Sequence, residues 1–438
     1  MKRLSSRLLS HALLQAVWVY AVFCEHAHAQ TKREEPQAFL LSEPTEFTSV
    51  LDGFVGGTLP DVRVSLSFRR STTRSVLARE HALEGDKTAG RSQHVAISRQ
   101  VTNALSLNIA IGVFRDLMVY LRVPLVLSDR RELTAPSGVS RDQVESILRS
   151  GVGALETSLF ELPYQSATRS GLPGIELGVA WGLANQFRTP YLPTWVVSLD
   201  TRIDLGQPMS ACTDRGGCDA GISRGTLAFN LDTRWSYRVR FVEPYLGLRF
   251  MREWATTAAS AFAKRGAVPS EVDTTPPTLQ ELTLGAALMA YEDRARFQRV
   301  TVDVRGYAAY ISEGRDYSPL FDALGTSINR QLSDPYRSPT GEVRSNGLTN
   351  VASYARFGAE VAVATQAARY VHFRLGVLLS HSTAHVLTNT PACVAASGGC
   401  TGDRVNPLYR PIIDLPGQRF LQVGDLSYDL FAQATGEF

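Results

Sequence analysis

The side chains that could carry out chemistry are few and scattered in this sequence. Beyond residue 29 the histidines are His81, His94, His372, His381 and His385. The run Ser380-His381-Ser382 is the nearest approach to a nucleophile beside a base, the pairing that hydrolases use. The sequence has no G-x-S-x-G, no H-E-x-x-H and no phosphate-binding glycine loop. We therefore predict no enzyme, no cofactor and no metal site, and interpret the Ser-His-Ser run as the polar end of a strand.

Four cysteines form two close pairs, Cys212 with Cys218 and Cys393 with Cys400. Each pair stands in a short stretch that contains Gly and Ser, Thr or Asp. We predict two local disulfides that staple loops, because exported proteins use closely spaced cysteines in this way. A metal site is the alternative, but no histidine or further cysteine lies near either pair in the sequence.

The first residues predict export. Basic residues precede an apolar run that ends at Cys24, and Ala27-His28-Ala29 stands before Gln30. This order is typical of a secretory signal peptide, which we assign to residues 1–29. An uncleaved membrane anchor is the alternative, although the run is short for a spanning helix and is interrupted by polar residues.

The charge of the chain speaks against a nucleic-acid partner. The formal net charge is +3 at pH 7, and most of it comes from the basic residues of the signal segment. The remainder is close to neutral, whereas nucleic-acid-binding proteins carry strong basic patches.

Apolar and polar residues alternate over strand-sized segments along the whole chain after the signal. The last segment shows this best, because Leu426, Tyr428 and Leu430 share one face of a strand that runs on to Phe438. An exposed apolar strand of this kind is hazardous in a soluble domain, but it suits a closed barrel in lipid. The segments that alternate are 62–68, 105–111, 117–127, 175–183, 195–205, 227–237, 242–250, 282–288, 300–304, 357–363, 371–379 and 426–438.

The connections between these segments alternate in length. Long connections are predicted at 70–98, 129–172, 206–224, 254–278, 312–350 and 384–424, and short ones at 112–116, 186–193, 238–240, 292–297 and 366–369. Bacterial outer-membrane barrels have short periplasmic turns and long extracellular loops. The fold class predicted is therefore all-β, an antiparallel transmembrane β-barrel of about 12 strands, with both cysteine pairs in the extracellular loops.

Two regions outside the strands have a pattern of their own. Ser140 to Gln143 reads as a capping box, and Val144, Ile147 and Leu148 follow at helical spacing. Residues 254–264 are alanine-rich and predict a short helix. Residues 30–57 precede the barrel, which we assign to 58–438, and form either a periplasmic lead-in or a plug inside the barrel.

If the apolar faces meet lipid, the opposite faces line the lumen, and they carry charges of both signs. One interpretation is a structural network of salt bridges that holds the wall; the other is a device that selects solutes. The lumen-lining residues predicted are Arg63, Arg122, Glu176, Asp200, Arg202, Asp204, Asp232, Arg234, Glu243, Arg249, Glu281, Asp303, Arg305, Arg356, Glu360, Arg374 and Asp429.

The alternating terminal strand that ends at Phe438, together with the export signal, resembles the Gram-negative outer-membrane β-barrel proteins, a class that includes porins and transporters. The resemblance implies a place in the cell outer membrane, in contact with its lipid. It also implies that the barrel-assembly machinery reads the terminal strand and Phe438. We expect a passive channel or transporter for a small solute. The alternatives are a structural or surface-interaction barrel with a closed lumen, and a barrel hydrolase.

Overall fold

The computed structural model describes residues 45–53, 61–81, 91–149, 157–215, 217–256, 260–263, 274–332, 345–394 and 405–438. The predicted signal peptide, Cys400 and most of the 30–57 segment lie outside these described residues.

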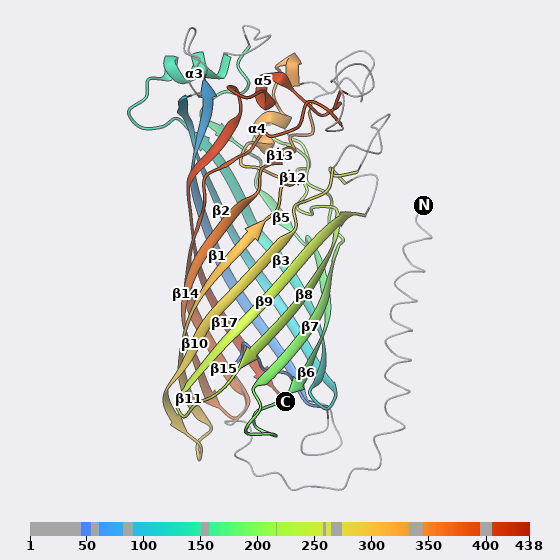
Figure 1. Cartoon of the computed structure of the whole chain (residues 1–438), viewed down its shortest axis with the longest axis vertical. Coiled ribbons are helices and arrows are strands. Elements are labelled where there is room, and N and C mark those ends of the chain that lie inside the picture. Colours follow the sequence, from blue (N-terminus) through green and yellow to red (C-terminus); the bar gives the residue numbers. More distant parts are fainter. Residues whose placement is uncertain are drawn as a thin grey trace.

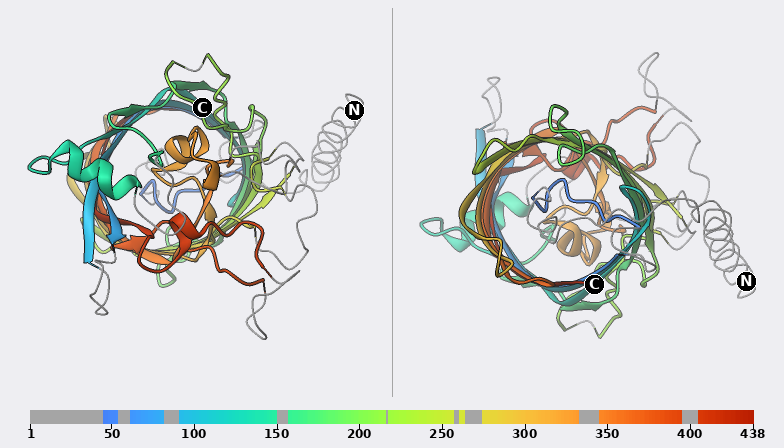
Figure 2. Two further views of the ribbon diagram at one scale, coloured as in Figure 1. Left: turned by 90° about the horizontal axis from the view of Figure 1, so that it is seen from above. Right: turned by 90° about the horizontal axis from the view of Figure 1, so that it is seen from below.

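Antiparallel strands close into one barrel, seen from the side in Figure 1 and along its axis in Figure 2. Twelve strands of the described chain form the ring, each hydrogen-bonded to the next, and β17 pairs with β1 to close it. The predicted fold class is therefore confirmed. The ring consists of β1 (Val62–His81), β2 (Arg91–Phe114), β3 (Leu117–Thr134), β6 (Gly174–Ala184), β7 (Thr194–Asp204), β8 (Thr226–Ser236), β9 (Val242–Ala255), β10 (Leu279–Asp293), β11 (Gln298–Ile311), β14 (Tyr354–Ala368), β15 (Val371–Ser382) and β17 (Phe420–Glu437).

The closing seam pairs the terminal strand, β17, with the first strand, β1. Val64 stands opposite Gly436 and Phe68 opposite Ala432. At its end, the backbone of Val62 exchanges two hydrogen bonds with that of Phe438, at 3.0 and 2.9 Å. The ring therefore has no free edge at the seam, which is the condition for a sheet without unpaired backbone groups.

The connections at one end are short, as predicted, but several strands extend into the predicted long connections, β1, β2 and β3 farthest, while β17 already begins at Phe420. The connection predicted at 70–98 is wrong, because β1 continues to His81 and β2 already begins at Arg91. Similarly, β3 runs to Thr134. The outward side chains of these extensions are largely polar, so the apolar alternation that reveals the lower strands is lost there.

The long-loop end carries small elements of its own. These are α3 (Arg141–Arg149), β4 (Tyr164–Gln165), β5 (Arg169–Gly171), β12 (Gly314–Asp316), α4 (Phe321–Gly325), the 3₁₀ turn η2 (Arg330–Leu332), β13 (Thr349–Val351), β16 (His385–Val386) and α5 (Pro411–Asp414). None of the described helices is both long and apolar enough to cross a membrane.

The helix predicted from its capping box is confirmed as α3. The backbone N–H of Gln143 donates to Oγ of Ser140 at 3.2 Å, and Val144, Ile147 and Leu148 are buried. The helix predicted at 254–264 is wrong in its described part, because Trp254 belongs to β9 and residues 260–263 form a turn.

Aromatic side chains cover glycines on neighbouring strands of the inner wall. A β-carbon on Gly178 would lie 2.2 Å from Cζ of Tyr120, and one on Gly285 would lie 2.4 Å from Cζ of Tyr245. Gly358 is covered in the same way by Tyr307. Glycine is required at these positions because the ring occupies the space of a side chain, and such pairs help a sheet to curve.

Candidate functional site

The strand register places the predicted lumen-lining charges on the inner side of the wall. They share this side because side chains alternate along each strand and the outer positions are apolar. The residues placed there are Arg63, Arg122, Glu176, Asp200, Arg202, Asp204, Asp232, Arg234, Glu243, Arg249, Glu281, Asp303, Arg305, Arg356, Glu360, Arg374 and Asp429.

The structure brings several of these charges together near the short-turn end. Nη2 of Arg374 lies 2.6 Å from Asp303 and 2.8 Å from Glu360. Arg305 reaches the other oxygen of Glu360 at 2.6 Å. At the seam, Arg63 pairs with Glu437 at 2.5 Å. Acids and bases of five neighbouring strands are thus neutralised by one another, as burial in a narrow lumen requires.

A second group crosses the opposite wall. Tyr120 donates to Asp200 at 3.2 Å, and Asn230 donates to the other oxygen of Asp200 at 2.9 Å. The oxygen of the Asn230 side chain accepts from Arg249 at 3.0 Å. Hydrogen bonds here link charges that lie too far apart for direct ion pairs.

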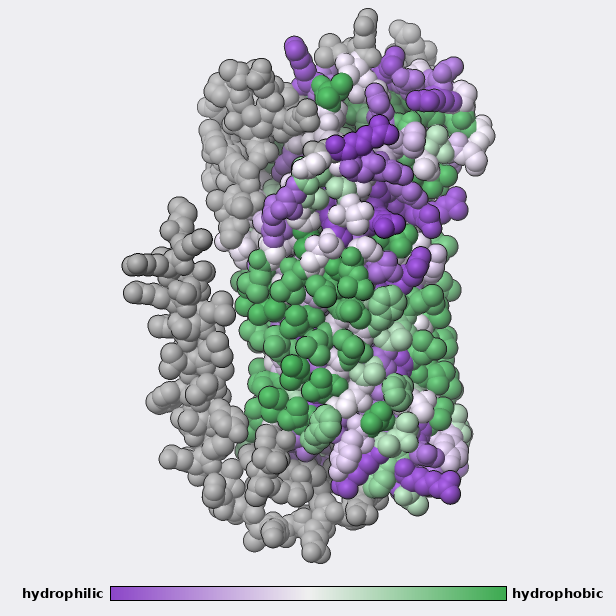
Figure 3. Space-filling view, turned by 180° about the vertical axis from the view of Figure 1, so that it is seen from behind, coloured by the Kyte–Doolittle hydropathy of each residue, from purple (hydrophilic) through white to green (hydrophobic). Residues whose placement is uncertain are grey.

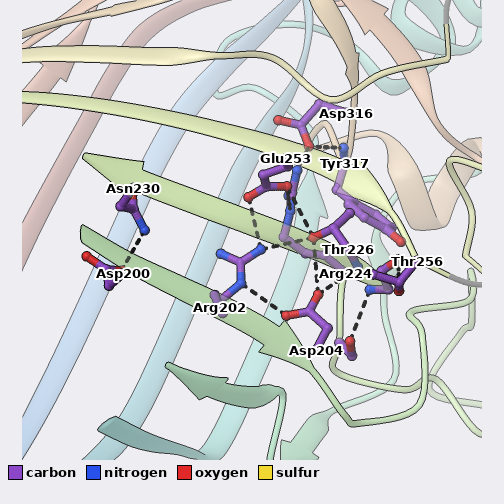
Figure 4. A network of polar contacts seen from close by, with 12 residues as sticks. Asp200, Arg202, Asp204, Arg224, Thr226, Asn230, Glu253, Thr256, Asp316 and Tyr317 are labelled. Carbon is purple, nitrogen blue, oxygen red and sulfur yellow. Dashed lines mark hydrogen bonds and ion pairs between the residues drawn. The ribbon is translucent and has the colours of Figure 1, made fainter. Parts of the chain in front are cut away.

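Figure 4 shows a third network, which joins the wall to the long loops. Glu253 of β9 lies between two guanidinium groups, those of Arg202 and Arg224, each at 2.9 Å. Arg224 also pairs with Asp316 of β12 at 2.8 Å. Burial alone would lower the pKa of Arg224, but the carboxylates of Asp316 and Glu253 raise it above its ordinary value. The network therefore fixes β12 against the barrel.

Residues 45–53 lie inside the barrel at the short-turn end, as the blue trace in Figure 2 shows. Glu46 accepts from Arg374 at 3.0 Å and from Gln433 at 2.8 Å. Asp52 pairs with Arg188 of the connection between β6 and β7. The backbone N–H of Thr45 donates to Glu243 at 3.2 Å. This segment, called the plug below, is therefore tied to several parts of the wall.

The centre of the plug also packs against the wall. The ring of Phe47 stacks on Tyr245, with the ring centroids 4.3 Å apart. Its carbonyl accepts from Arg234 at 2.8 Å, and the hydroxyl of Thr48 lies 2.7 Å from that of Ser236. The sequence leaves residues 30–57 as either a periplasmic lead-in or a plug inside the barrel. Their described part, residues 45–53, lies inside the barrel.

A polar cavity of about 120 Å³ remains beside the plug. Glu46, Phe47 and Arg374 line it, together with Gln366 and His372 of the wall. Oε1 of Gln366 and Nε2 of His372 are buried without a hydrogen-bond partner among the described residues. Buried polar atoms are normally satisfied, so this cavity has room and partners for water or a polar solute.

The long-loop end holds an apolar core and a buried ion pair. All five residues of α4 are buried, and Asp322 among them forms two hydrogen bonds with Arg169, at 2.6 and 3.1 Å. Figure 2 shows the orange α4 region across the mouth of the barrel. The core beneath the loops includes Leu77, Leu133, Ile147, Leu148, Leu159, Leu320, Leu324, Leu332, Ile412 and Phe420.

The Ser-His-Ser run does not form a hydrolase dyad. His381 is an exposed position of β15 that alternates with Ser382, which is 1% exposed and faces inward. Nδ1 of His381 lies 2.6 Å from the carbonyl oxygen of Asp425, and the hydroxyl of Ser382 accepts from Arg356 at 3.2 Å. The base and the nearest hydroxyl thus have other partners on opposite faces of the wall.

The cysteine prediction is confirmed for the first pair. Cys212 and Cys218 form a disulfide in the connection between β7 and β8. Cys393 is also disulfide-bonded, while Cys400 lies outside the described residues. No group of His, Cys, Asp and Glu suited to a metal ion occurs in the described part of the chain.

The outer surface decides where the barrel lies. Figure 3 shows one face of the molecule, with an apolar belt across the lower part of the wall and a largely hydrophilic surface above it. The exposed fractions are large, 56% for Leu284 and 66% for Leu375. A soluble protein does not expose apolar residues on every strand of a sheet, whereas a closed sheet in lipid must. Every barrel strand contributes, with Leu66, Leu107, Val119, Val179, Leu199, Leu231, Leu248, Leu284, Val304, Val361, Leu375 and Leu430.

The chain is an outer-membrane β-barrel. Its short turns then face the periplasm and its long loops face the outside, as in other barrels of this class. The plug lies at the periplasmic end.

No known protein family and no curated protein matches the chain. It is similar in structure to an outer membrane channel from Pseudomonas putida F1, with a TM-score of 0.43 and 8% identity over 90% of this chain and 99% of that one. A FadL homologue from Pseudomonas aeruginosa has a TM-score of 0.32 and 9% identity, over 86% and 90% of the two chains. The outer membrane protease OmpT from Escherichia coli has a TM-score of 0.30 and 9% identity, over 87% and 99%. At such low values the likeness says nothing about what this barrel does.

The alternation along the strands identifies the inward charges, but it misses the residues that fill the two ends. Glu46 and Asp52 lie in a segment without strand periodicity, and their partners are more than 100 residues away in the sequence. Asp322 and Arg169 are likewise 153 residues apart. The one sign of the plug in the local sequence is the proline and glycine content of residues 30–57, which precede the first strand.

Proposed function

We propose that this outer-membrane barrel is a passive channel for small polar solutes, closed at rest by the plug, residues 45–53. The observation that carries the proposal is the way the plug is held. Glu46 and Asp52 bind the wall through ion pairs, and Phe47 binds it through a stacked ring. Thr45, Thr48 and the carbonyl of Phe47 add hydrogen bonds. The net contribution of each such contact is on the order of 1 kcal/mol, so the plug can leave without unfolding the wall.

The lining supports a solute without strong net charge. Arg63, Arg374, Asp303 and Glu437 lie around the cavity beside the plug, so both signs are present. A lumen lined by one sign would favour the opposite ion, whereas a mixed lining favours neutral or zwitterionic solutes. Oε1 of Gln366, which has no hydrogen-bond partner among the described residues, can accept a hydrogen bond from a solute that passes.

A reversible lock tests the channel directly. The hydroxyls of Thr48 and Ser236 are 2.7 Å apart, so the double variant Thr48→Cys/Ser236→Cys would tie the plug to β8 when oxidised. We expect low conductance in planar bilayers under oxidising conditions and higher conductance after reduction. Wild-type protein with and without reductant controls for the native disulfides.

The converse variant weakens the plug. Glu46→Gln/Asp52→Asn removes both acidic anchors, and we expect more frequent open events and faster solute uptake into liposomes. Glu145→Gln, in an exposed ion pair of α3, is the matched control and leaves conductance unchanged. If the wild type, the reduced lock and the anchor variant are all closed to ions and sugars, the channel proposal is wrong.

A second function, a closed surface-interaction barrel, is favoured by the apolar core at the outer mouth. Leu320, Leu324 and Leu332 pack into that core together with residues of α3 and α5. A mouth sealed in this way would present a rigid loop surface and pass nothing. The bilayer experiment separates the two functions, because a surface barrel stays closed even when both anchors of the plug are removed.

The proposed partners follow from the closing strand and the belt. We propose that lipid surrounds the apolar belt, and that the barrel-assembly machinery recognises β17 and the exposed Phe438. Truncating Phe438 should then slow insertion into the outer membrane without changing the conductance of refolded protein. We propose no catalytic activity, since His381 and Ser382 face opposite sides of the wall.

A further inference from the structure

Four arginines cluster on the outer surface of β1, β2 and β3, just above the apolar belt. Leu66 and Phe68 of β1 belong to the belt, and Arg70 and Arg74 continue the same outward face with no register shift between them. Arg99 of β2 stands directly opposite Arg74. All three arginine side chains are exposed to the surroundings.

The fourth member lies on the next strand. β3 has a bulge at Leu127, so the position opposite Val101 is Arg130, which is exposed on the same outer face. Opposed residues on neighbouring strands have β-carbons about 5 Å apart, and diagonal neighbours about 7–8 Å. Arg74, Arg99 and Arg130 are therefore close enough for one anionic group to reach more than one of them.

In the part of the chain that the structure describes, only one arginine of the cluster has an anionic partner. Arg99 has one, Glu132, at 3.3 Å. Within the described residues, Arg70, Arg74 and Arg130 form no ion pair or hydrogen bond through their side chains. Like charges placed directly opposite, such as Arg74 and Arg99, destabilise a sheet, so a bound anion would relieve this repulsion.

The position of the cluster identifies the source of that anion. The arginines follow the last apolar residues of the belt on the side of the long loops, where the headgroups of the outer leaflet begin. Guanidinium groups match phosphate in geometry and charge. We propose that Arg70, Arg74, Arg99 and Arg130 bind the phosphate groups of an outer-leaflet lipid, whose acyl chains lie on the belt beside Phe68. The proposal rests on the placement of the barrel in the outer membrane and is independent of channel activity.

Binding of a bis-phosphorylated lipid A to the detergent-purified full chain tests this proposal. The double variant Arg74→Gln/Arg130→Gln removes two arginines that have no ion-pair or hydrogen-bond partner among the described residues, so the barrel should remain intact, which heat-modifiable gel mobility checks. A hydrogen bond between charged groups changes affinity by about tenfold or more. We therefore expect lipid adducts in native mass spectrometry to weaken by about a hundredfold.

The matched control is Arg252→Gln, an exposed outward arginine of β9 that stacks on Trp254, and it should leave affinity within about twofold. Dephosphorylated lipid should bind the wild type as weakly as intact lipid binds the double variant. Equal binding by the double variant, equal binding of the dephosphorylated lipid, or the same loss in Arg252→Gln would each overturn the proposal. Competition by inorganic phosphate as strong as that by the lipid would show a free-anion site instead and would also overturn it.

Discussion

The ring of Tyr245 occupies the space that a side chain at Gly285 would need. A β-carbon at this glycine would lie 2.4 Å from Cζ of the tyrosine. Across the glycine, the phenol donates to Asp303 of β11 at 2.5 Å. The same arrangement recurs with Tyr120, Gly178 and Asp200 on β3, β6 and β7. Each unit fastens three consecutive strands from the inside.

Gly285→Ala should destabilise the barrel by about 1–3 kcal/mol, because the methyl group must displace the ring of Tyr245 or shift a strand. The loss should appear as a lower midpoint of the heat-modifiable gel transition and of urea unfolding in detergent micelles.

Gly306→Ala provides the control for this substitution. A β-carbon there has only the carbonyl oxygen of Gly358 nearby, at 3.6 Å, so stability should be unchanged or slightly increased. Adding Tyr245→Ala to Gly285→Ala should recover part of the loss. A Gly285→Ala barrel as stable as Gly306→Ala would show that the ring moves freely.

Asp322→Asn should strongly destabilise the packed loops around α4 at the long-loop end. The side chain of Arg169 is fully buried and that of Asp322 is 5% exposed. Removing one charge of a buried pair costs about 3–5 kcal/mol, because the other charge remains without compensation. Limited proteolysis should cleave the loop around α4 faster, while the belt-spanning strands stay protected. The exposed pair of Arg149 and Glu145 offers the comparison, and Glu145→Gln should change stability by less than about 0.5 kcal/mol.

Arg79→Met should detach two loop helices from the wall. The guanidinium of Arg79 is buried and donates to the carbonyl oxygens of Ile147, Ile412 and Gln418, at 2.5, 2.7 and 3.2 Å. Methionine fills similar space but leaves these acceptors unpaired, at a net loss of about 2 kcal/mol or more. Hydrogen exchange should accelerate in α3 and α5 together. Arg74→Met on the same strand, which is exposed, should leave both helices protected.

The segment around α5 should become less stable as the pH rises. Burial raises the pKa of Asp414 to about 6, although the backbone N–H groups of Arg410 and Thr390 donate to it. An acid whose folded pKa lies above its unfolded value of about 3.8 binds its proton more tightly when folded. The protonated form therefore stabilises the fold fully below about pH 4, and this contribution, about 3 kcal/mol, is lost between about pH 4 and pH 6.

Hydrogen exchange of α5 at several pH values, corrected for the intrinsic rate, measures this loss. Asp414→Asn should make the protection of α5 nearly independent of pH over that window. Asp142→Asn, which changes an exposed carboxyl of α3, should leave the wild-type profile intact. A flat profile in the wild type would contradict the prediction.

The strands and the inward charges could be predicted because both depend on local alternation. Val361 and Glu360 are neighbours in the sequence, and a period of two assigns one to lipid and the other to the lumen. The same rule predicts that the terminal strand closes the barrel, since an apolar strand without a partner is unstable, but it does not give the register that places Val64 opposite Gly436. It fails above the belt, where Arg70 and Thr72 continue β1 without an apolar pattern.

The contents of the two ends could not be predicted in this way. Whether Phe47 stacks on Tyr245, or Asp322 meets Arg169, depends on how distant segments fold back into the tube. Such contacts leave no periodic pattern in the sequence, and each of these side chains is chemically able to pair with many other residues. The outward arginines were missed for a related reason, because each one alone reads as an ordinary loop residue.

The seam between β1 and β17 also constrains how the barrel can form. Arg63 and Glu437, which meet there, are 374 residues apart in the sequence. The entropy of closing so long a loop must be met before the seam contributes any stability, and folding slows as contacts become more distant in sequence. Until that moment both outer strands expose a full row of unpaired backbone groups. We therefore expect the seam to form after the other strand pairings, which makes the open sheet the form most exposed to proteolysis and aggregation.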